Sequence, residues 1–62
     1  MEKTLQQKML EYRAREDISQ AELAKRCNLT TPTVAMVERG LQEPSKLTES
    51  KILLVVDNKE NK

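Results

Sequence analysis

Residues 19–39, SQAELAKRCNLTTPTVAMVER, determine the fold of this chain. Apolar residues recur at helical spacing on both sides of a turn: Leu23, Ala24 and Cys27 before it, and Val34 and Val37 after it. The chain must turn sharply at Asn28, and asparagine is one of the few non-glycine residues that tolerate the left-handed backbone conformation. The spacing therefore predicts two short helices joined by a tight turn, each with one apolar face.

Two capping boxes mark helix starts in the first third of the chain. Thr4 with Gln7 predicts a first helix that begins at Leu5, and Ser19 with Glu22 predicts a second that ends near residue 27. In each pair the hydroxyl of the first residue and the side chain of the second satisfy backbone N–H groups that the helix leaves free.

The third helix is bounded on both sides by residues that favour helix ends. Thr30 predicts its N-cap, and Pro32 fits its first turn because the N–H groups there have no partner within the helix. Gly40 is a good residue to follow the last turn, so we expect the helix to run from Thr31 to about Arg39.

The C-terminal segment leaves two structures open. Ser45 predicts the cap of a fourth helix over residues 46–56. Residues 52–56 are apolar on every side of such a helix, and three of the five are β-branched, so a short strand is the alternative. We expect a folded domain over residues 1–57 and a disordered polar tail over residues 58–62.

Composition limits what the chain can do. Its 62 residues suffice for one domain with a small core. One cysteine and no histidine leave no intramolecular disulfide and no zinc site, so we expect no metal and no cofactor. The single glycine rules out a glycine-rich phosphate loop, and no paired carboxylates frame a cleft, so we expect no enzyme. No apolar stretch reaches the ~20 residues of a membrane span, and we expect a cytoplasmic protein.

The charge balance bears on nucleic-acid binding. A dedicated DNA-binding domain usually has a clear basic excess, whereas this chain has a net charge of +1. Any affinity for DNA must therefore come from how the charges are distributed over the surface.

A set of residues between Tyr12 and Pro44 matches a known family without gaps: Arg13, Ile18-Ser19-Gln20, Leu23-Ala24, Leu29-Thr30, Val34, Val37-Glu38, Gly40 and Pro44. The chain resembles the phage-repressor and Cro-type (xenobiotic-response-element-like, or XRE-like) helix-turn-helix family. The resemblance implies an all-α fold, a compact four-helix lambda-repressor-like DNA-binding domain whose third helix enters the major groove. It also implies a transcription regulator, most often a repressor, that binds double-stranded DNA sequence-specifically.

The resemblance further implies which residues contact DNA: Gln20, Thr30, Thr31, Pro32, Thr33, Ala35, Met36 and Arg39. Gln20 matches a residue that binds a phosphate from the N-terminus of the second helix. Four of the residues would meet base edges, namely Thr31, Pro32, Ala35 and Met36. Thr33 and Arg39 flank them and are expected at the DNA backbone.

The base-facing residues have unusual chemistry for that task. The strongest base discrimination comes from side chains that make two hydrogen bonds to one base, and Thr31, Pro32, Ala35 and Met36 cannot do this. Thr31 can make one hydrogen bond, and the other three can press on thymine methyl groups. Three explanations stay open: a modest, partly apolar recognition of bases, recognition of DNA shape and dimer spacing, or a face that binds protein.

Two further expectations concern structure and assembly. Arg13 and Glu38 match an ion pair that connects the first and third helices in the family. The excess apolar surface of the last helix predicts a homodimer interface formed by Ile52, Leu53, Val55 and Val56, on a two-fold DNA site with half-sites ~34 Å apart.

A second function is compatible with the same residues. An antitoxin-like or antirepressor-like protein could keep the fold and use the third helix to bind a protein partner. The near-neutral charge and the apolar surface of Pro32, Ala35 and Met36 favour this alternative. Salt dependence distinguishes the two, because only phosphate contacts weaken steeply as salt rises.

Overall fold

Four helices make up most of residues 3–57, the part of the chain that the computed structural model describes. They are α1 (Leu5–Glu16), α2 (Gln20–Cys27), α3 (Thr31–Arg39) and α4 (Lys46–Val56). No strand occurs within residues 3–57, so the all-α prediction is confirmed. The expected tail, residues 58–62, and the first two residues of the expected domain lie outside the described residues.

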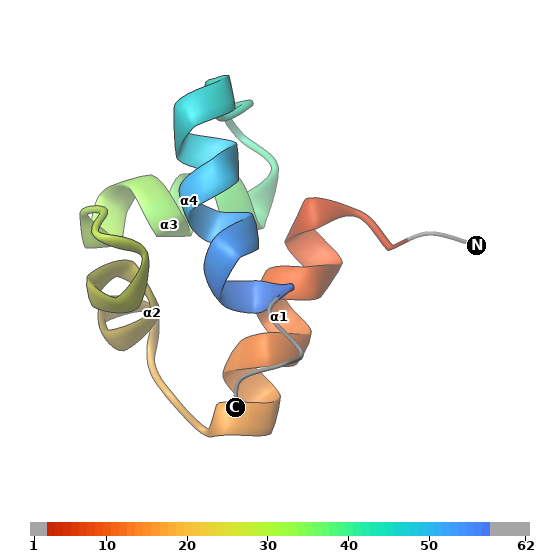
Figure 1. Cartoon of the computed structure of the whole chain (residues 1–62), viewed down its shortest axis with the longest axis vertical. Helices are drawn as coiled ribbons and strands as arrows, with labels where there is room; N and C mark the ends of the chain where they lie inside the picture. Colours follow the sequence, from red (N-terminus) through yellow and green to blue (C-terminus); the bar gives the residue numbers. More distant parts are fainter. Residues whose placement is uncertain (1–2, 58–62) are drawn as a thin grey trace.

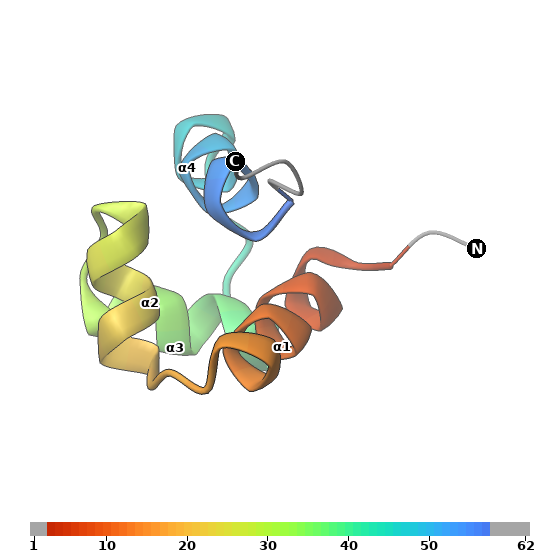
Figure 2. The ribbon, with the colours of Figure 1, turned by 60° about the horizontal axis from the view of Figure 1, so that its bottom comes forward.

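The helices surround a small core on all sides. Figure 2 shows α2 crossing α3 steeply, with α1 beside the far end of α3 and α4 lying over the other three helices. In Figure 1 the same α4, in cyan to blue, runs down the middle of the molecule in front of α3. This arrangement leaves the side of α3 that points away from α4 uncovered.

The helix starts follow from local hydrogen bonds. Thr4 Oγ1 accepts from the Gln7 backbone N–H at 3.1 Å, and the Gln7 side chain accepts from the Thr4 N–H at 3.0 Å, so the first capping box is complete. Ser19 Oγ accepts from the Glu22 N–H at 3.1 Å. The prediction that the Glu22 side chain accepts from the Ser19 backbone N–H is wrong, because the Glu22 carboxylate accepts instead from Arg26 Nε at 3.2 Å.

Three helix ends are formed by residues with left-handed backbone. Asp17, Asn28 and Gly40 have φ angles of 57°, 61° and 75°. Each places its N–H group near the last free carbonyl groups of the preceding helix. The turn expected at Asn28 is therefore present, and it ends α2 three residues before α3 begins.

The last segment is a helix, so the strand alternative is wrong. Ser45 Oγ accepts from the Thr48 N–H at 3.2 Å and begins α4. Ile52 and Val56 lie one turn apart on the side of α4 that faces the core. The apolar run is not uniform in burial, since Leu54 is 73% exposed.

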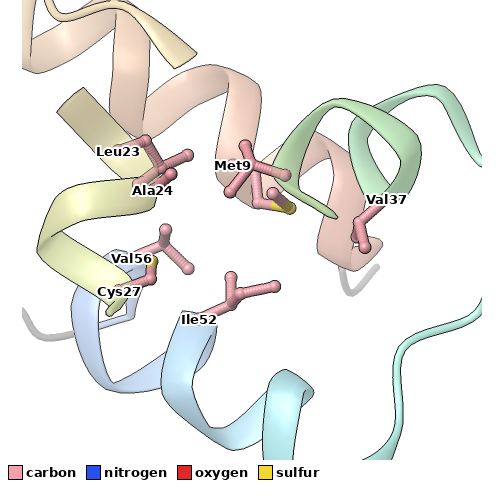
Figure 3. Packing of buried hydrophobic residues seen from close by; sticks show 8 residues of the cluster. Met9, Leu23, Ala24, Cys27, Val37, Ile52 and Val56 are labelled. Carbon is pink, nitrogen blue, oxygen red and sulfur yellow. The ribbon is translucent and has the colours of Figure 1, made fainter. Parts of the chain in front are cut away.

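The core is formed by one apolar cluster that all four helices supply: Met9, Leu23, Ala24, Cys27, Val34, Val37, Ile52 and Val56. Figure 3 shows Met9, Leu23 and Ile52 pointing toward one another from three helices. The presence of Ile52 and Val56 here corrects their expected place in a dimer interface, because both side chains are buried within one chain. Leu53 and Val55 are half-buried, and their interface role stays a prediction.

A polar cluster on the surface joins α1 to α2. Arg26 Nη1 donates to the Tyr12 hydroxyl at 3.0 Å and lies 3.4 Å from a Glu16 carboxylate oxygen. The guanidinium of Arg15 lies 5.2 Å from the centre of the Tyr12 ring. The hydrogen bond to Tyr12, followed by one to Glu22, raises the pKa of Arg26. These contacts connect the surface of α1 to that of α2. None of the helices described is long and apolar enough to cross a membrane.

Candidate nucleic-acid interface

The uncovered face of α3 carries a stripe of exposed side chains. Pro32, Met36 and Arg39 lie at positions i, i+4 and i+7, which places them on one side of the helix. Val34 and Val37 lie on the opposite side and are buried in the core. Pro32 and Arg39 are exposed, and Met36 is 39% exposed. The core therefore fixes which side of α3 a partner can reach.

The first turn of α3 adds hydroxyl groups beside this stripe. Thr30 Oγ1 accepts from the Thr33 N–H at 3.4 Å, and the two threonine hydroxyls lie 2.8 Å apart. Thr33 is half-buried, as is Ala35, whereas Thr31 is exposed. Within residues 3–57 the Thr31 hydroxyl has no hydrogen bond, so it is the threonine of α3 that is available to a ligand.

Behind the stripe, Arg13 and Glu38 form the ion pair that the resemblance implies. Arg13 Nε and Nη2 donate to the two carboxylate oxygens of Glu38 at 2.9 and 3.0 Å. Such a two-bond arrangement is geometrically specific and strong. The Glu38 side chain is 4% exposed and that of Arg13 24%. The hydrogen bonds to Glu38 raise the pKa of Arg13, so the guanidinium stays charged.

Gln20 joins this pair, which sequence reasoning missed. Its Nε2 donates to Glu38 Oε1 at 2.9 Å, so the carboxylate receives three hydrogen bonds. Glu38 itself could have indicated this bond. A carboxylate beside Val34 and Val37, on the core side of a helix, needs several hydrogen-bond donors. Gln20 keeps a second N–H that this bond does not use. The bond holds the side chain in place at the start of α2.

The electrostatics of α3 differ from those of the whole chain. Glu38 is the only carboxylate of α3, and it is buried and neutralised, so the helix presents no negative charge outward. The guanidinium of Arg39 makes no ion pair within the described residues. Most other cations there are paired with carboxylates: Lys3, Lys8, Arg13, Arg15 and Arg26. The net charge of +1 therefore understates how well this face suits an anion.

Three features outside this face bear on metal binding and reactivity. No group of three His, Cys, Asp or Glu side chains within residues 3–57 could hold a metal ion. Cys27 is buried, and burial raises the pKa of its thiol, which disfavours the reactive thiolate. An open hollow between α1 and the loop after α3 is bordered by Leu5, Gly40 and Pro44, and Glu43 is the one ionisable residue among the described residues that line it.

Comparison with known proteins agrees with this geometry. The family model for helix-turn-helix proteins matches residues 9–55, from the first helix to the end of the last. No curated protein matches the chain, and neither does any solved structure.

Proposed function

The chain belongs to the XRE-type helix-turn-helix family of DNA-binding regulators, and we propose that it is a sequence-specific transcriptional repressor. The observation that carries the proposal is the outward face of α3, which is exposed, free of carboxylates and ends in Arg39, a cation with no ion pair among residues 3–57. A helix with these properties fits the major groove, where phosphates line both walls.

In the proposed complex, α3 lies in the major groove and α2 spans the DNA backbone. Gln20 and Arg39 bind phosphates, and the bond from Gln20 to Glu38 supports this role because it orders the side chain before DNA arrives. The hydroxyls of Thr30 and Thr33 face the backbone from the first turn of α3. Thr31 faces the base edges, together with the apolar residues of the stripe.

A homodimer is part of the proposal, because one domain of this size makes a limited interface with DNA. Ile52 and Val56 are buried in the core of one chain and are left out of the proposed dimer interface. Leu47 and Leu54, two turns apart on α4, are both more than half exposed and extend the half-buried surface of Leu53 and Val55. Sedimentation equilibrium at high protein concentration is expected to show dimers, and a persistent monomer would contradict this part of the proposal.

A second candidate function has its own support. The apolar exposure of Pro32 and Met36 favours a protein-interaction module, of the antitoxin or antirepressor kind, that uses the same face of α3. Such an interface responds little to salt, whereas DNA binding through several phosphates weakens steeply.

Selection from a random duplex library at low salt, repeated near physiological salt, tests the proposal. Enrichment of a pseudo-palindrome supports a dimeric DNA-binding regulator, and a single half-site supports a monomeric one. If no sequence is enriched, the protein-interaction module is favoured instead.

Matched variants then test the assigned phosphate contacts. Arg39→Gln is expected to weaken binding to all sequences and to reduce the slope of log K against log salt by about 1, because it removes a charge. Gln20→Ala is expected to weaken binding to all sequences with a nearly unchanged slope, because Gln20 carries no charge. Lys46→Gln removes the same charge from α4, on the other side of the core from the outward face of α3, and is expected to leave the slope nearly unchanged. Equal slopes for Arg39→Gln and Lys46→Gln would contradict a phosphate contact at Arg39.

A further inference from the structure

The centre of the α3 stripe is apolar. Pro32 is exposed, Met36 is 39% exposed, and Ala35 lies half-buried between their turns. Met36 is the only large exposed apolar residue of α3. None of these three side chains can donate or accept a strong hydrogen bond, so recognition through them must depend on apolar contact.

The major groove offers one apolar group, the C5 methyl of thymine. The major-groove edges of guanine, adenine and cytosine carry hydrogen-bonding groups and no methyl group, and those groups would lose water without gaining a partner against Pro32 or Met36. Thymine presents one acceptor, O4, beside its methyl group. Thymine is therefore the base at which these side chains make the most apolar contact. Resting on the proposed function, we propose that this chain selects its DNA sites by contacts from Pro32, Ala35 and Met36 to thymine methyl groups.

The helix geometry sets the spacing of those thymines. Pro32 and Met36 lie four residues apart, which is about 6 Å along the helix axis. Successive bases of one strand are about 3.4 Å apart along the DNA axis. Because a helix in the major groove is inclined to the DNA axis, the two side chains span at most about two base steps. The proposal therefore requires closely spaced thymines in each half-site.

Polar groups surround the apolar centre in a way that suits DNA better than protein. The hydroxyl of Thr31 lies at one end of the stripe and the guanidinium of Arg39 at the other. Neither has a side-chain partner in the part of the chain that the structure describes. Both can bind phosphate or a base edge, and the single carboxylate of α3 is buried behind them. A protein partner at the same face is the outcome that the experiment below would reveal.

The test replaces thymines of the selected duplex by deoxyuridine, one position at a time. This change removes only the methyl group and keeps base pairing. Each contacted methyl is expected to contribute about fourfold in affinity, equivalent to about 0.8 kcal/mol for one buried carbon. A duplex in which 5-methylcytosine·G replaces a contacted T·A pair is expected to bind several times more tightly than a duplex with C·G at the same position.

Two variants assign the effect to α3. Met36→Ala is expected to reduce the penalty of uracil at its position from about fourfold to less than about twofold, while circular dichroism shows an intact fold. Leu10→Ala makes the same kind of truncation on the exposed surface of α1 and is expected to keep the full penalty. The ratio of thymine to uracil affinity is the measured quantity, so a change in dimerisation does not affect it.

The outcomes separate this inference from the proposed function. Duplex binding that is indifferent to uracil at every position overturns the methyl contacts and leaves the DNA-binding proposal standing. A penalty that is the same in Met36→Ala and in the unmodified chain overturns the assignment to Met36. Failure to bind any duplex, at low or physiological salt, overturns the proposed function and the inference together.

Discussion

Replacing Arg13 by methionine is expected to destabilise the domain more than any other single change of a charged residue among those described. The substitution leaves the Glu38 carboxylate, 4% exposed, with one hydrogen bond from Gln20 in place of three. Breaking a buried ion pair from one side costs about 3–5 kcal/mol. Because the Arg13 side chain is 24% exposed, we expect the lower end of that range, about 3 kcal/mol.

The size of the domain makes this loss easy to measure. A chain of 62 residues is expected to have a free energy of unfolding of about 3–9 kcal/mol. Urea unfolding followed by circular dichroism at 222 nm should therefore show a large shift of the midpoint for Arg13→Met, or a chain that is partly unfolded without urea. A second change, Glu38→Gln, removes the unpaired charge and is expected to restore part of the lost stability.

The ion pair between Lys3 and Glu11 is the control. Its atoms are closer, at 2.6 Å, but both side chains are more than half exposed. An exposed pair contributes about 0–1 kcal/mol, so Lys3→Met is expected to have a small effect. If Arg13→Met and Lys3→Met both lower the free energy of unfolding by less than about 1 kcal/mol, the argument from burial is refuted.

Three further predictions concern the core and the helix ends. Ile52→Ala is expected to cost about 3 kcal/mol because it leaves a cavity, whereas Leu54→Ala is expected to stay within about 0.5 kcal/mol; equal losses in thermal melts would contradict the orientation of α4. Cys27 is buried, and burial raises the pKa of its thiol. Because DTNB cannot reach a buried thiol, it should react at neutral pH only as fast as the chain unfolds, and reaction at the rate of a free thiol would contradict this. Gly40→Ala is expected to cost about 1 kcal/mol because the φ of +75° is left-handed and the new Cβ would meet the Gln6 side chain; an unchanged urea midpoint would refute the strain.

Helix boundaries were predictable because they depend on neighbouring residues. The hydroxyls of Thr4, Ser19, Thr30 and Ser45 cap the four helices from the position before each, as the sequence predicts. The same locality explains the left-handed turn at Asn28. Each of these features needs only the residues within one helical turn, and no knowledge of the rest of the fold.

The orientation of α4 was not predictable in the same way. A helix over residues 46–56 has apolar residues on several sides, so the sequence alone does not say which of them faces inward. The positions of Met9, Leu23 and Cys27 decide it, because Ile52 and Val56 fill the space that these side chains leave. The expectation of a dimer interface at Ile52 and Val56 failed for this reason.

The candidate site was predictable in part. The exposure of Pro32 and Met36 follows from the spacing of Val34 and Val37, which fixes the outward side of α3. The bond from Gln20 to Glu38 joins residues 18 positions apart. It depends on how α2 and α3 cross, which no local pattern specifies.

The net charge is a weak guide to nucleic-acid binding in this chain, because charge acts on DNA from the surface that DNA meets. Ten acidic residues nearly balance eleven basic ones, yet the only acidic residue of α3 is held inside by Arg13 and Gln20. The ion pair that stabilises the fold therefore also removes a carboxylate from the proposed DNA-binding face. Structure and electrostatics are thus coupled at Glu38: a variant that frees this carboxylate to the surface would weaken the domain and repel phosphate at the same time.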